Sequence, residues 1–312
     1  MALKLARLAS GKKWYISTID AFHGKSYGAV SMAGKGKYRE PYLPMIQQVQ
    51  HVEYGNADAA EAAIKNLIHV GESVAAMIVE PIQGEAGIII PPEGYLKRLR
   101  EICDKYGVFL IFDEIQTGLG RTGAMWACED AGVTPDIMTF GKAFGGGIMP
   151  ITGIIARPHL WTEDIQENPW ILGSPTFGGN PVCCSAALAT LDFIIRNDIP
   201  KVCKEKGEYF LERLNIMKEK YEILEDVRGK GLLIGSEFKT SELGYGVAKN
   251  LFKRKVMTAG TLVNAKTIRI EPPAILRYET IDIVLERLEE SIIEVQEEFD
   301  FPVSSIAASE DK

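Results

Sequence analysis

Short apolar runs alternate with longer amphipathic stretches along the first two thirds of the chain. We expect strands at residues 13–17, 74–79, 108–112, 137–140 and 152–156. The run Val108–Phe112 has no polar interruption, which is typical of a parallel strand buried on both faces. Between strands, Pro92–Tyr106 carries apolar residues at a 3.6-residue period, which indicates a helix. The alternation of strand and helix predicts an α/β fold, a mostly parallel sheet flanked by helices.

Helical periodicity recurs at several other places. We expect further helices at residues 2–9, 58–68, 183–195, 202–221 and 281–299. Pro92 near the start of its helix and Gly107 just after the end are the usual boundary signals. Residues 38–51 contain two prolines and little periodicity, so we expect them to be irregular.

The pattern changes near residue 197. Beyond it come a charged amphipathic helix, a glycine-broken strand within residues 227–238, a second strand at 267–271 and a final helix with one apolar face. We therefore predict a large domain over residues 1–197 and a smaller α+β domain over residues 198–302. Residues 303–312 are predicted to be a disordered tail.

Composition narrows the class of protein. The chain has 312 residues and a net charge of -7, which argues against nucleic acid as a partner. No apolar run is long enough to span a membrane, and the first residues lack the core of a signal peptide. Five cysteines without a C-x-x-C pair fit a reducing compartment, so we expect a cytoplasmic protein. The four scattered histidines predict no metal site.

Candidate chemistry lies at the ends of two of the expected strands. One strand ends in Asp113-Glu114, and the next is followed by Lys142 and then Gly145–Gly147. Open α/β sheets place their ligands at the carboxyl ends of strands. Pyridoxal 5′-phosphate (PLP) needs a lysine for its aldehyde and an aspartate for its pyridinium nitrogen. We therefore hypothesise that Lys142 is a Schiff-base lysine and that Asp113 is its acidic counterpart.

Each residue alone has a simpler interpretation. Lys142 is also compatible with a solvated loop, and Asp113 with the N-cap of a helix. A strand ending in Asp-Glu is also found in P-loop ATPases. That interpretation requires G-x-x-x-x-G-K-[ST], and Ile19 stands where the first glycine should precede Gly24-Lys25-Ser26.

Longer motifs decide between these interpretations. In chain order, they are D-E-I-Q-T-G-L-G-R-T-G (113–123), T-F-G-K-A-F-G-G-G (139–147) and T-F-G-G-N-P (176–181). They resemble the class III aminotransferases, PLP enzymes of fold type I. The match extends through A-F-H-G-K-S (21–26), E-P-I-Q-G-E (80–85) and N-A-K-T-I-R-I-E-P-P (264–273). The last motif is most similar to the putrescine aminotransferases, within the ornithine and 4-aminobutyrate aminotransferase group.

The resemblance implies roles for residues around the cofactor. Lys142 is implied to hold PLP and to move a proton from the substrate carbon. Asp113 is implied to keep the ring nitrogen protonated. Phe22 is implied to stack on the ring with His23 beside it, and Gln116 to bond the ring hydroxyl oxygen.

The resemblance also implies an assembly and a substrate site. Thr176 is implied to reach the PLP phosphate of the partner subunit, which requires a homodimer with shared active sites, possibly paired into a tetramer. Arg269 is implied to bind the carboxylate of 2-oxoglutarate, because an arginine fork suits a carboxylate. Glu85 is implied to pair with Arg269 during the amine half-reaction and to release it for the keto acid.

The expected activity is transfer of the amino group of putrescine, or a similar ω-amine, to 2-oxoglutarate. Alternative donors are ornithine, acetylornithine, 4-aminobutyrate and cadaverine, and an aminomutase is a further possibility. The chain begins inside a helix that in the family follows a phosphate-binding turn, so we expect it to be N-terminally truncated relative to the family. An inactive fragment that serves as a dimerisation or binding module is the alternative of another class.

Overall fold

The computed structural model describes residues 1–173 and 175–299, and the tail predicted over 303–312 lies outside these residues. The chain forms two compact units. Among the described residues, unit 1 comprises 1–83, 91–119 and 124–198, and unit 2 comprises 84–90, 120–123 and 199–299. The assignment of two short early loops to unit 2 was not predicted from the sequence. No helix among the described residues is long and apolar enough to cross a membrane.

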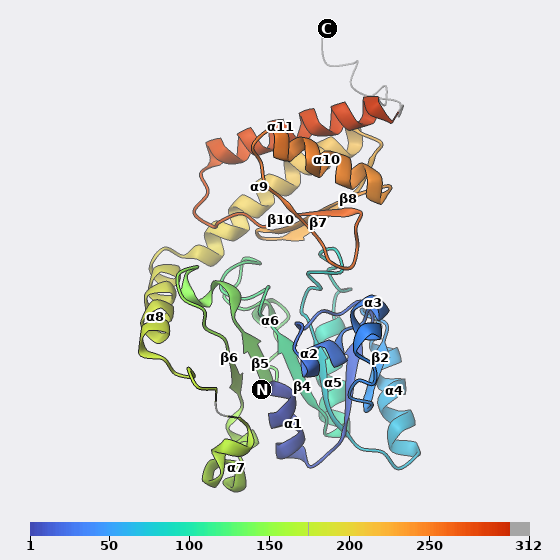
Figure 1. Cartoon of the computed structure of the whole chain (residues 1–312), viewed down its shortest axis with the longest axis vertical. Coiled ribbons are helices and arrows are strands. Elements are labelled where there is room, and N and C mark those ends of the chain that lie inside the picture. Colours follow the sequence, from blue (N-terminus) through green and yellow to red (C-terminus); the bar gives the residue numbers. More distant parts are fainter. Residues whose placement is uncertain (174, 300–312) are drawn as a thin grey trace. The chain divides into compact units, whose positions relative to one another are not determined.

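Unit 1 contains a six-stranded sheet in the order β2-β1-β3-β4-β5-β6 (Figure 1). Strands β1 to β5 are parallel to their neighbours, and β6 is antiparallel to β5. The strands are β1 (Trp14–Thr18), β2 (Val49–Val52), β3 (Val74–Val79), β4 (Phe109–Asp113), β5 (Ile137–Phe140) and β6 (Gly153–Ala156). The mostly parallel sheet predicted from the sequence is thereby confirmed.

Helices cover this sheet and connect its strands. The helices of unit 1 are α1 (Ala2–Ser10), α2 (Tyr27–Met32), α3 (Gly36–Arg39), α4 (Ala57–His69), α5 (Tyr95–Tyr106), α6 (Ala127–Asp130), α7 (Glu163–Glu167) and α8 (Pro181–Arg196). Short 3₁₀ turns add η1 (Glu40–Tyr42), η2 (Lys142–Gly145), η3 (Pro158–Leu160) and η4 (Pro169–Ile171). The short helices were not predicted, because four to six residues carry too little periodicity.

Two apolar cores lie on the two faces of the sheet, as the unbroken run in β4 predicted. Leu110 and Phe112 pack with α4 and α5 in one core. Ile111 packs with α1 and the segment around α7 in the other. Successive side chains of a strand point to opposite faces, and the residues of this run are buried except for the partly buried Phe109. The sheet is therefore held rigidly between two layers.

Unit 2 is a smaller α+β unit. Its four-stranded sheet has the order β7-β8-β10-β9, and the three pairings are antiparallel. Figure 1 shows the three helices of this unit along one side of the sheet. The elements are α9 (Ile199–Lys220), β7 (Leu224–Lys230), β8 (Leu233–Phe238), α10 (Ser241–Lys253), β9 (Ala259–Gly260), β10 (Thr267–Ile270) and α11 (Tyr278–Glu298).

Two predictions of local structure are wrong. Residues 38–51 are not wholly irregular, because their last residues join β2, the parallel edge strand beside β1. Residues 227–238 are not one broken strand but the two strands of a hairpin. Its turn contains Gly231 at φ +55°, where an added Cβ would lie 2.5 Å from the carbonyl oxygen of Arg121. Only glycine fits that close approach, and the predicted break in the strand is the turn between β7 and β8.

Candidate active site

An ion pair between Asp113 and His23 lies at the carboxyl end of β4. The Asp113 Oδ2 atom is 2.7 Å from His23 Nδ1, and the two side chains are 7% and 3% exposed. The other carboxylate oxygen, Oδ1, accepts hydrogen bonds from the Thr139 hydroxyl at 2.8 Å and from the backbone N–H of Ile115 at 3.2 Å. One carboxylate is therefore held by His23, by Thr139 of β5 and by the backbone that follows β4.

The pKa values of both partners are shifted toward the charged form. Burial raises the pKa of Asp113, but the hydrogen bond and charge of His23, with the bonds from Thr139 and Ile115, outweigh burial and lower the pKa below its ordinary value. Burial lowers the pKa of His23, but the hydrogen bond to Asp113 and the charges of Asp113 and Glu80 outweigh it and raise the pKa. These surroundings therefore favour the ionised form of the carboxylate and the protonated form of the imidazole.

Asp113 and His23 both line a cavity of about 630 Å³ within unit 1. Phe140, at the end of β5, lines the same cavity. The volume lies in the range of small-molecule and cofactor sites. A carboxylate that stays ionised in such a cavity fits the protonated ring nitrogen of PLP. His23 Nε2 is buried and makes no hydrogen bond within the described part of the chain, so this nitrogen can still bond a polar group of a ligand.

The carboxylate next in sequence has a different role. Glu114 is 1% exposed and accepts hydrogen bonds from the Thr117 hydroxyl at 2.5 Å and from the backbone N–H groups of Ala127 and Cys128 at 3.1 and 2.8 Å. Burial raises the pKa of Glu114 above its usual value, although these bonds oppose the rise. Glu114 therefore ties the loop after β4 to the start of α6 and serves structure.

Lys142 begins η2, two positions after the cavity-lining Phe140. Its backbone has φ +45°, a left-handed conformation that a lysine rarely adopts. Its side chain is exposed, and within the described residues its ammonium makes no hydrogen bond or ion pair. A strained backbone at a position of predicted chemistry supports a functional role for Lys142.

The structure places the other predicted cofactor residues as follows. Phe22 is half-buried: its backbone N–H donates to Glu80 Oε1 at 2.9 Å, and its ring meets Tyr38 edge-on. Gln116 is half-buried and follows Ile115, which lines the cavity. Thr176 is exposed and follows Pro175, which also lines it. The roles of Phe22, Gln116 and Thr176 stay predictions.

Glu85 and Arg269, 184 positions apart in the chain, meet in unit 2. The Arg269 Nη1 group donates to Glu85 Oε1 at 2.6 Å, and the side chains are 14% and 9% exposed. Glu85 Oε2 accepts from the backbone N–H of Leu262 at 3.0 Å. Arg269 Nε lies 3.0 Å from a second carboxylate, Glu271 Oε2. The arginine is therefore held between two acidic side chains.

Sequence reasoning missed three contributors to these sites. Thr139 bonds the same carboxylate as His23, and Glu80 accepts the backbone N–H of Phe22. Glu271 is the second partner of Arg269. The available signal was position: Thr139 is the one polar residue in β5, Glu80 directly follows β3, and Glu271 directly follows β10, two residues after Arg269. Residues two apart share a face of a strand, so the strand predicted over residues 267–271 could have indicated the last contact.

Comparison with known proteins agrees with this geometry. The sequence profile "Aminotransferase class-III" matches residues 1–292. The ornithine aminotransferase of Toxoplasma gondii ME49 is 29% identical, with a TM-score of 0.88 over 95% of this chain and 70% of that one. A transaminase from the marine bacterium Virgibacillus is 29% identical, with a TM-score of 0.88 over 96% and 73%.

A third solved structure is an amine transaminase from an uncultivated Pseudomonas species in its PLP-bound form. It is 27% identical to this chain, with a TM-score of 0.86 over 94% of this chain and 74% of that one. The profile spans nearly the whole chain, and the fold agrees across these structures. The chain thus belongs to the class III aminotransferase family of PLP-dependent transaminases and has their type I fold.

Proposed function

We propose that this aminotransferase transfers the amino group of putrescine, or of a similar ω-amine, to 2-oxoglutarate, giving glutamate and an aminoaldehyde. The observation that carries the proposal is the paired state of Arg269. An arginine that binds a carboxylate in one half-reaction must be neutralised in the other, because an unpaired desolvated guanidinium is strongly unfavourable. Glu85 supplies that neutralisation at 2.6 Å.

The charges around Arg269 favour an ammonium over a carboxylate while Glu85 is in place. One guanidinium between Glu85 and Glu271 gives the group a formal charge of about -1. The far ammonium of a diamine donor is attracted to such a group. Ornithine and 4-aminobutyrate carry a carboxylate that competes with Glu85 for Arg269. This balance supports a diamine as the first choice of donor.

The residues of unit 1 perform the proton chemistry in this proposal. Bound PLP supplies an aldehyde that takes up the amino group and a ring that accepts electrons. The Lys142 amine removes a proton from the substrate carbon and returns it during transfer. Asp113, held ionised by His23, keeps the ring nitrogen protonated. Gln116 and Phe22 orient the ring, by a hydrogen bond and by stacking.

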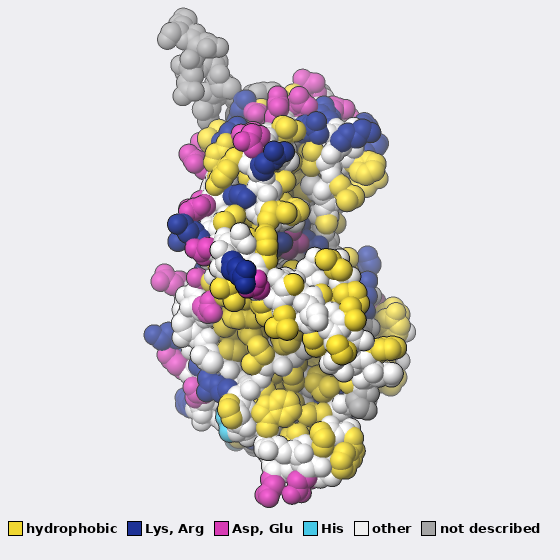
Figure 2. Space-filling model, turned by 90° about the vertical axis from the view of Figure 1, so that its left-hand side faces the viewer, with side chains coloured by type: hydrophobic (Ala, Val, Ile, Leu, Met, Phe, Trp, Pro, Cys, Tyr) yellow, Lys and Arg dark blue, Asp and Glu magenta, His cyan; other side chains and the backbone are white. Residues whose placement is uncertain are grey.

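We also propose that the active form is a homodimer whose second copy packs on α8. This helix exposes large apolar side chains that include Leu188, 68% exposed, and Ile195, 71% exposed. Figure 2 faces the side on which α8 lies and shows hydrophobic side chains gathered there with few charges. A contiguous apolar face of this kind is typical of a protein interface. Thr176 lies five residues before α8, which supports its predicted reach into the partner's site.

The test is an absorbance scan of the purified chain with added PLP, before and after putrescine, beside Lys142→Ala. We expect a band near the visible range that requires Lys142 and bleaches with putrescine. Glutamate formed from 2-oxoglutarate is then measured with putrescine, cadaverine, ornithine, acetylornithine and 4-aminobutyrate as donors. Faster turnover with an amino acid donor would assign that donor instead. Product without 2-oxoglutarate would indicate an aminomutase, and no Lys142-dependent band would indicate a non-catalytic binding module.

A further inference from the structure

The loop that carries Glu85 is part of unit 2 and is held there by backbone hydrogen bonds. It comprises residues 84–90, and its Glu85 carbonyl oxygen accepts from the backbone N–H of Val263 at 3.0 Å. Ile88 is fully buried although its φ is +58°, an unusual value for a β-branched residue. Such a backbone persists only where the surroundings fix it. The position of Glu85 therefore depends on what holds this loop.

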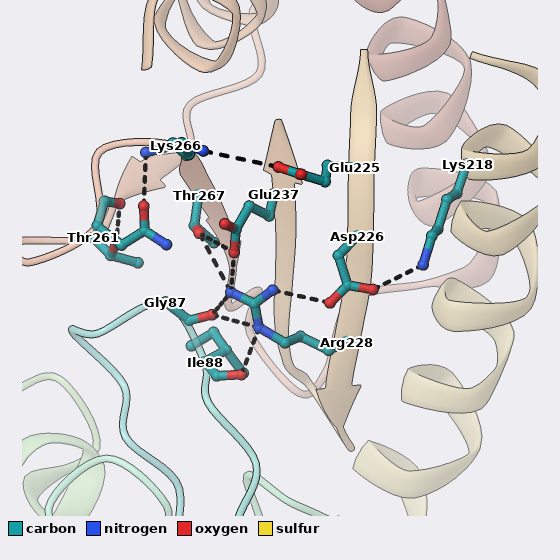
Figure 3. Close-up of polar contacts among 11 residues, drawn as sticks. Gly87, Ile88, Lys218, Glu225, Asp226, Arg228, Glu237, Thr261, Lys266 and Thr267 are labelled. Atoms are coloured by element: carbon teal, nitrogen blue, oxygen red, sulfur yellow. Dashed lines mark hydrogen bonds and ion pairs between the residues drawn. The ribbon is translucent and has the colours of Figure 1, made fainter. Parts of the chain in front are cut away.

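Arg228, on β7, contacts the loop backbone directly. Its Nε donates to the carbonyl oxygens of Gly87 at 2.9 Å and Ile88 at 3.1 Å, and its Nη2 donates to Gly87 at 2.6 Å. Figure 3 shows the guanidinium pointing from its strand into the bend formed by these two residues. A charged donor that bonds two successive carbonyl groups fixes the course of the chain through the bend.

Two carboxylates orient the guanidinium from the opposite side. Asp226 Oδ2 accepts from Nη1 of Arg228 at 2.9 Å, and Glu237 Oε2 accepts from Nη2 at 2.6 Å (Figure 3). Lys218 in turn lies 2.8 Å from Asp226 Oδ1. The side chain of Arg228 is only 17% exposed. All three nitrogens of the planar fork are engaged, a geometry that a lysine cannot reproduce.

The approach of loop and strands leaves no room for a side chain. Gly87 has φ +119°, and an added Cβ would lie 3.0 Å from Arg228 Nη2 and from Thr267 Oγ1. A Cβ on Gly235 of β8 would lie 3.0 Å from the Gly87 carbonyl oxygen. Thr267 stands two residues before Arg269 on β10, so both point to the same side of that strand. The loop is thus fitted against the strand that carries Arg269.

We propose that Arg228 is a positioning residue: it clamps residues 84–90 so that Glu85 stays on Arg269. This inference rests on the proposed function for its kinetic consequence, the masking of Arg269 during the amine half-reaction. Arg228 acts through Glu85 and sets the balance between the two half-reactions. A residue that only stabilised the β7–β8 hairpin would affect both half-reactions equally.

The first test is independent of catalysis. Hydrogen exchange is measured for the backbone amides of Leu262 and Val263, which donate to Glu85, in Arg228→Gln. Loss of the clamp should speed their exchange about tenfold or more. The matched control is Arg254→Gln, which removes an arginine of the same unit that bonds Glu290 and pairs with Glu294. The control should leave these two amides unchanged. Unchanged exchange in Arg228→Gln would overturn the proposal.

The second test compares half-reactions in holoenzyme. Arg228→Gln should slow the putrescine half-reaction about tenfold more than the glutamate half-reaction, and the same bias should appear in Glu85→Gln. The double variant Arg228→Gln/Glu85→Gln should show little more bias than Glu85→Gln alone, because both changes disrupt the same Glu85–Arg269 pair. Arg228→Lys should restore only part of the rate that the putrescine half-reaction loses in Arg228→Gln. Equal slowing of both half-reactions by Arg228→Gln, when Glu85→Gln shows the bias, would refute a positioning role.

A variant on the loop side covers the case in which Arg228→Gln does not fold. Gly87→Ala keeps every charge of the cluster but places a methyl group against Arg228 and strains a backbone at positive φ. It should speed exchange at Leu262 and Val263 in the same way, and normal exchange there would refute the clamp. If Glu85→Gln shows no bias between half-reactions, the proposed switch fails. The exchange results still decide whether Arg228 fixes the loop.

Discussion

Replacing Asp113 with asparagine should reverse the pH dependence of the stability of unit 1 between pH 6 and 8.5. The carboxylate is buried and holds His23 at 2.7 Å. In the parent protein the folded pKa of His23 is raised above 6.5, so its stabilisation is present below that pH and lost as the pH rises. In Asp113→Asn, burial lowers the pKa of His23 and only the charge of Glu80 still opposes it, so we expect stability to be lost instead as the pH falls.

The magnitude follows from the geometry. Removing one partner of a buried ion pair costs about 3–5 kcal/mol while the other partner stays charged. At pH 8.5 His23 of the variant is neutral, and the cost falls to about 1–3 kcal/mol for the altered hydrogen bonds. The difference between the two proteins should therefore grow toward pH 6, by at most about 1.4 kcal/mol per pH unit, the limit for one proton.

The assay is urea unfolding without added PLP, followed by tryptophan fluorescence. All four tryptophans lie in unit 1, so the signal reports that unit. Thr139→Val is the matched control, because it removes a neutral hydrogen bond to the same carboxylate. It should cost about 1 kcal/mol and leave the pH dependence nearly unchanged. A constant offset between Asp113→Asn and the parent at every pH would refute the charged pair.

Three further predictions concern other parts of the molecule. Glu114→Gln should destabilise unit 1 by about 1–3 kcal/mol in the same urea assay, because one buried backbone N–H loses its acceptor; no loss would contradict the structural role. Phe210→Ala, at a fully buried site in α9, should destabilise unit 2 by about 3–5 kcal/mol, measured by circular dichroism. Leu188→Lys should shift the protein from dimer to monomer in analytical ultracentrifugation, because it buries a charge in the proposed interface, whereas the exposed Lys201→Ala should not.

Local pattern predicted much of unit 1. The apolar run of β4 is unbroken because that strand has a core on each face, and the apolar residues of α5 are periodic because that helix is buried on one face. Both patterns can be recognised from neighbouring residues alone. The edge strand β2 was missed because its Val49–Val52 segment is short and partly exposed. Its strand character comes from pairing with β1, a contact that the local sequence does not encode.

The hairpin of unit 2 is a second feature that the local sequence could not predict. The sequence marks Gly231 as a break, but a bulge and a turn use glycine alike. The close approach to the Arg121 carbonyl, and the antiparallel register of β7 and β8, determine that the chain reverses there.

By itself the sequence determined the longer helices, most strands of the parallel sheet and the residues with candidate chemistry, because hydrophobic periodicity, strand ends and motifs can be recognised in short stretches of chain. Tertiary structure alone decided which groups meet. It separated the adjacent carboxylates Asp113 and Glu114 into a cavity residue and a helix-linking residue, because successive residues point to different surroundings. It also brought Arg228 and Arg269 to one early loop across more than a hundred residues. Such contacts arise from packing of the whole chain, which no local pattern specifies.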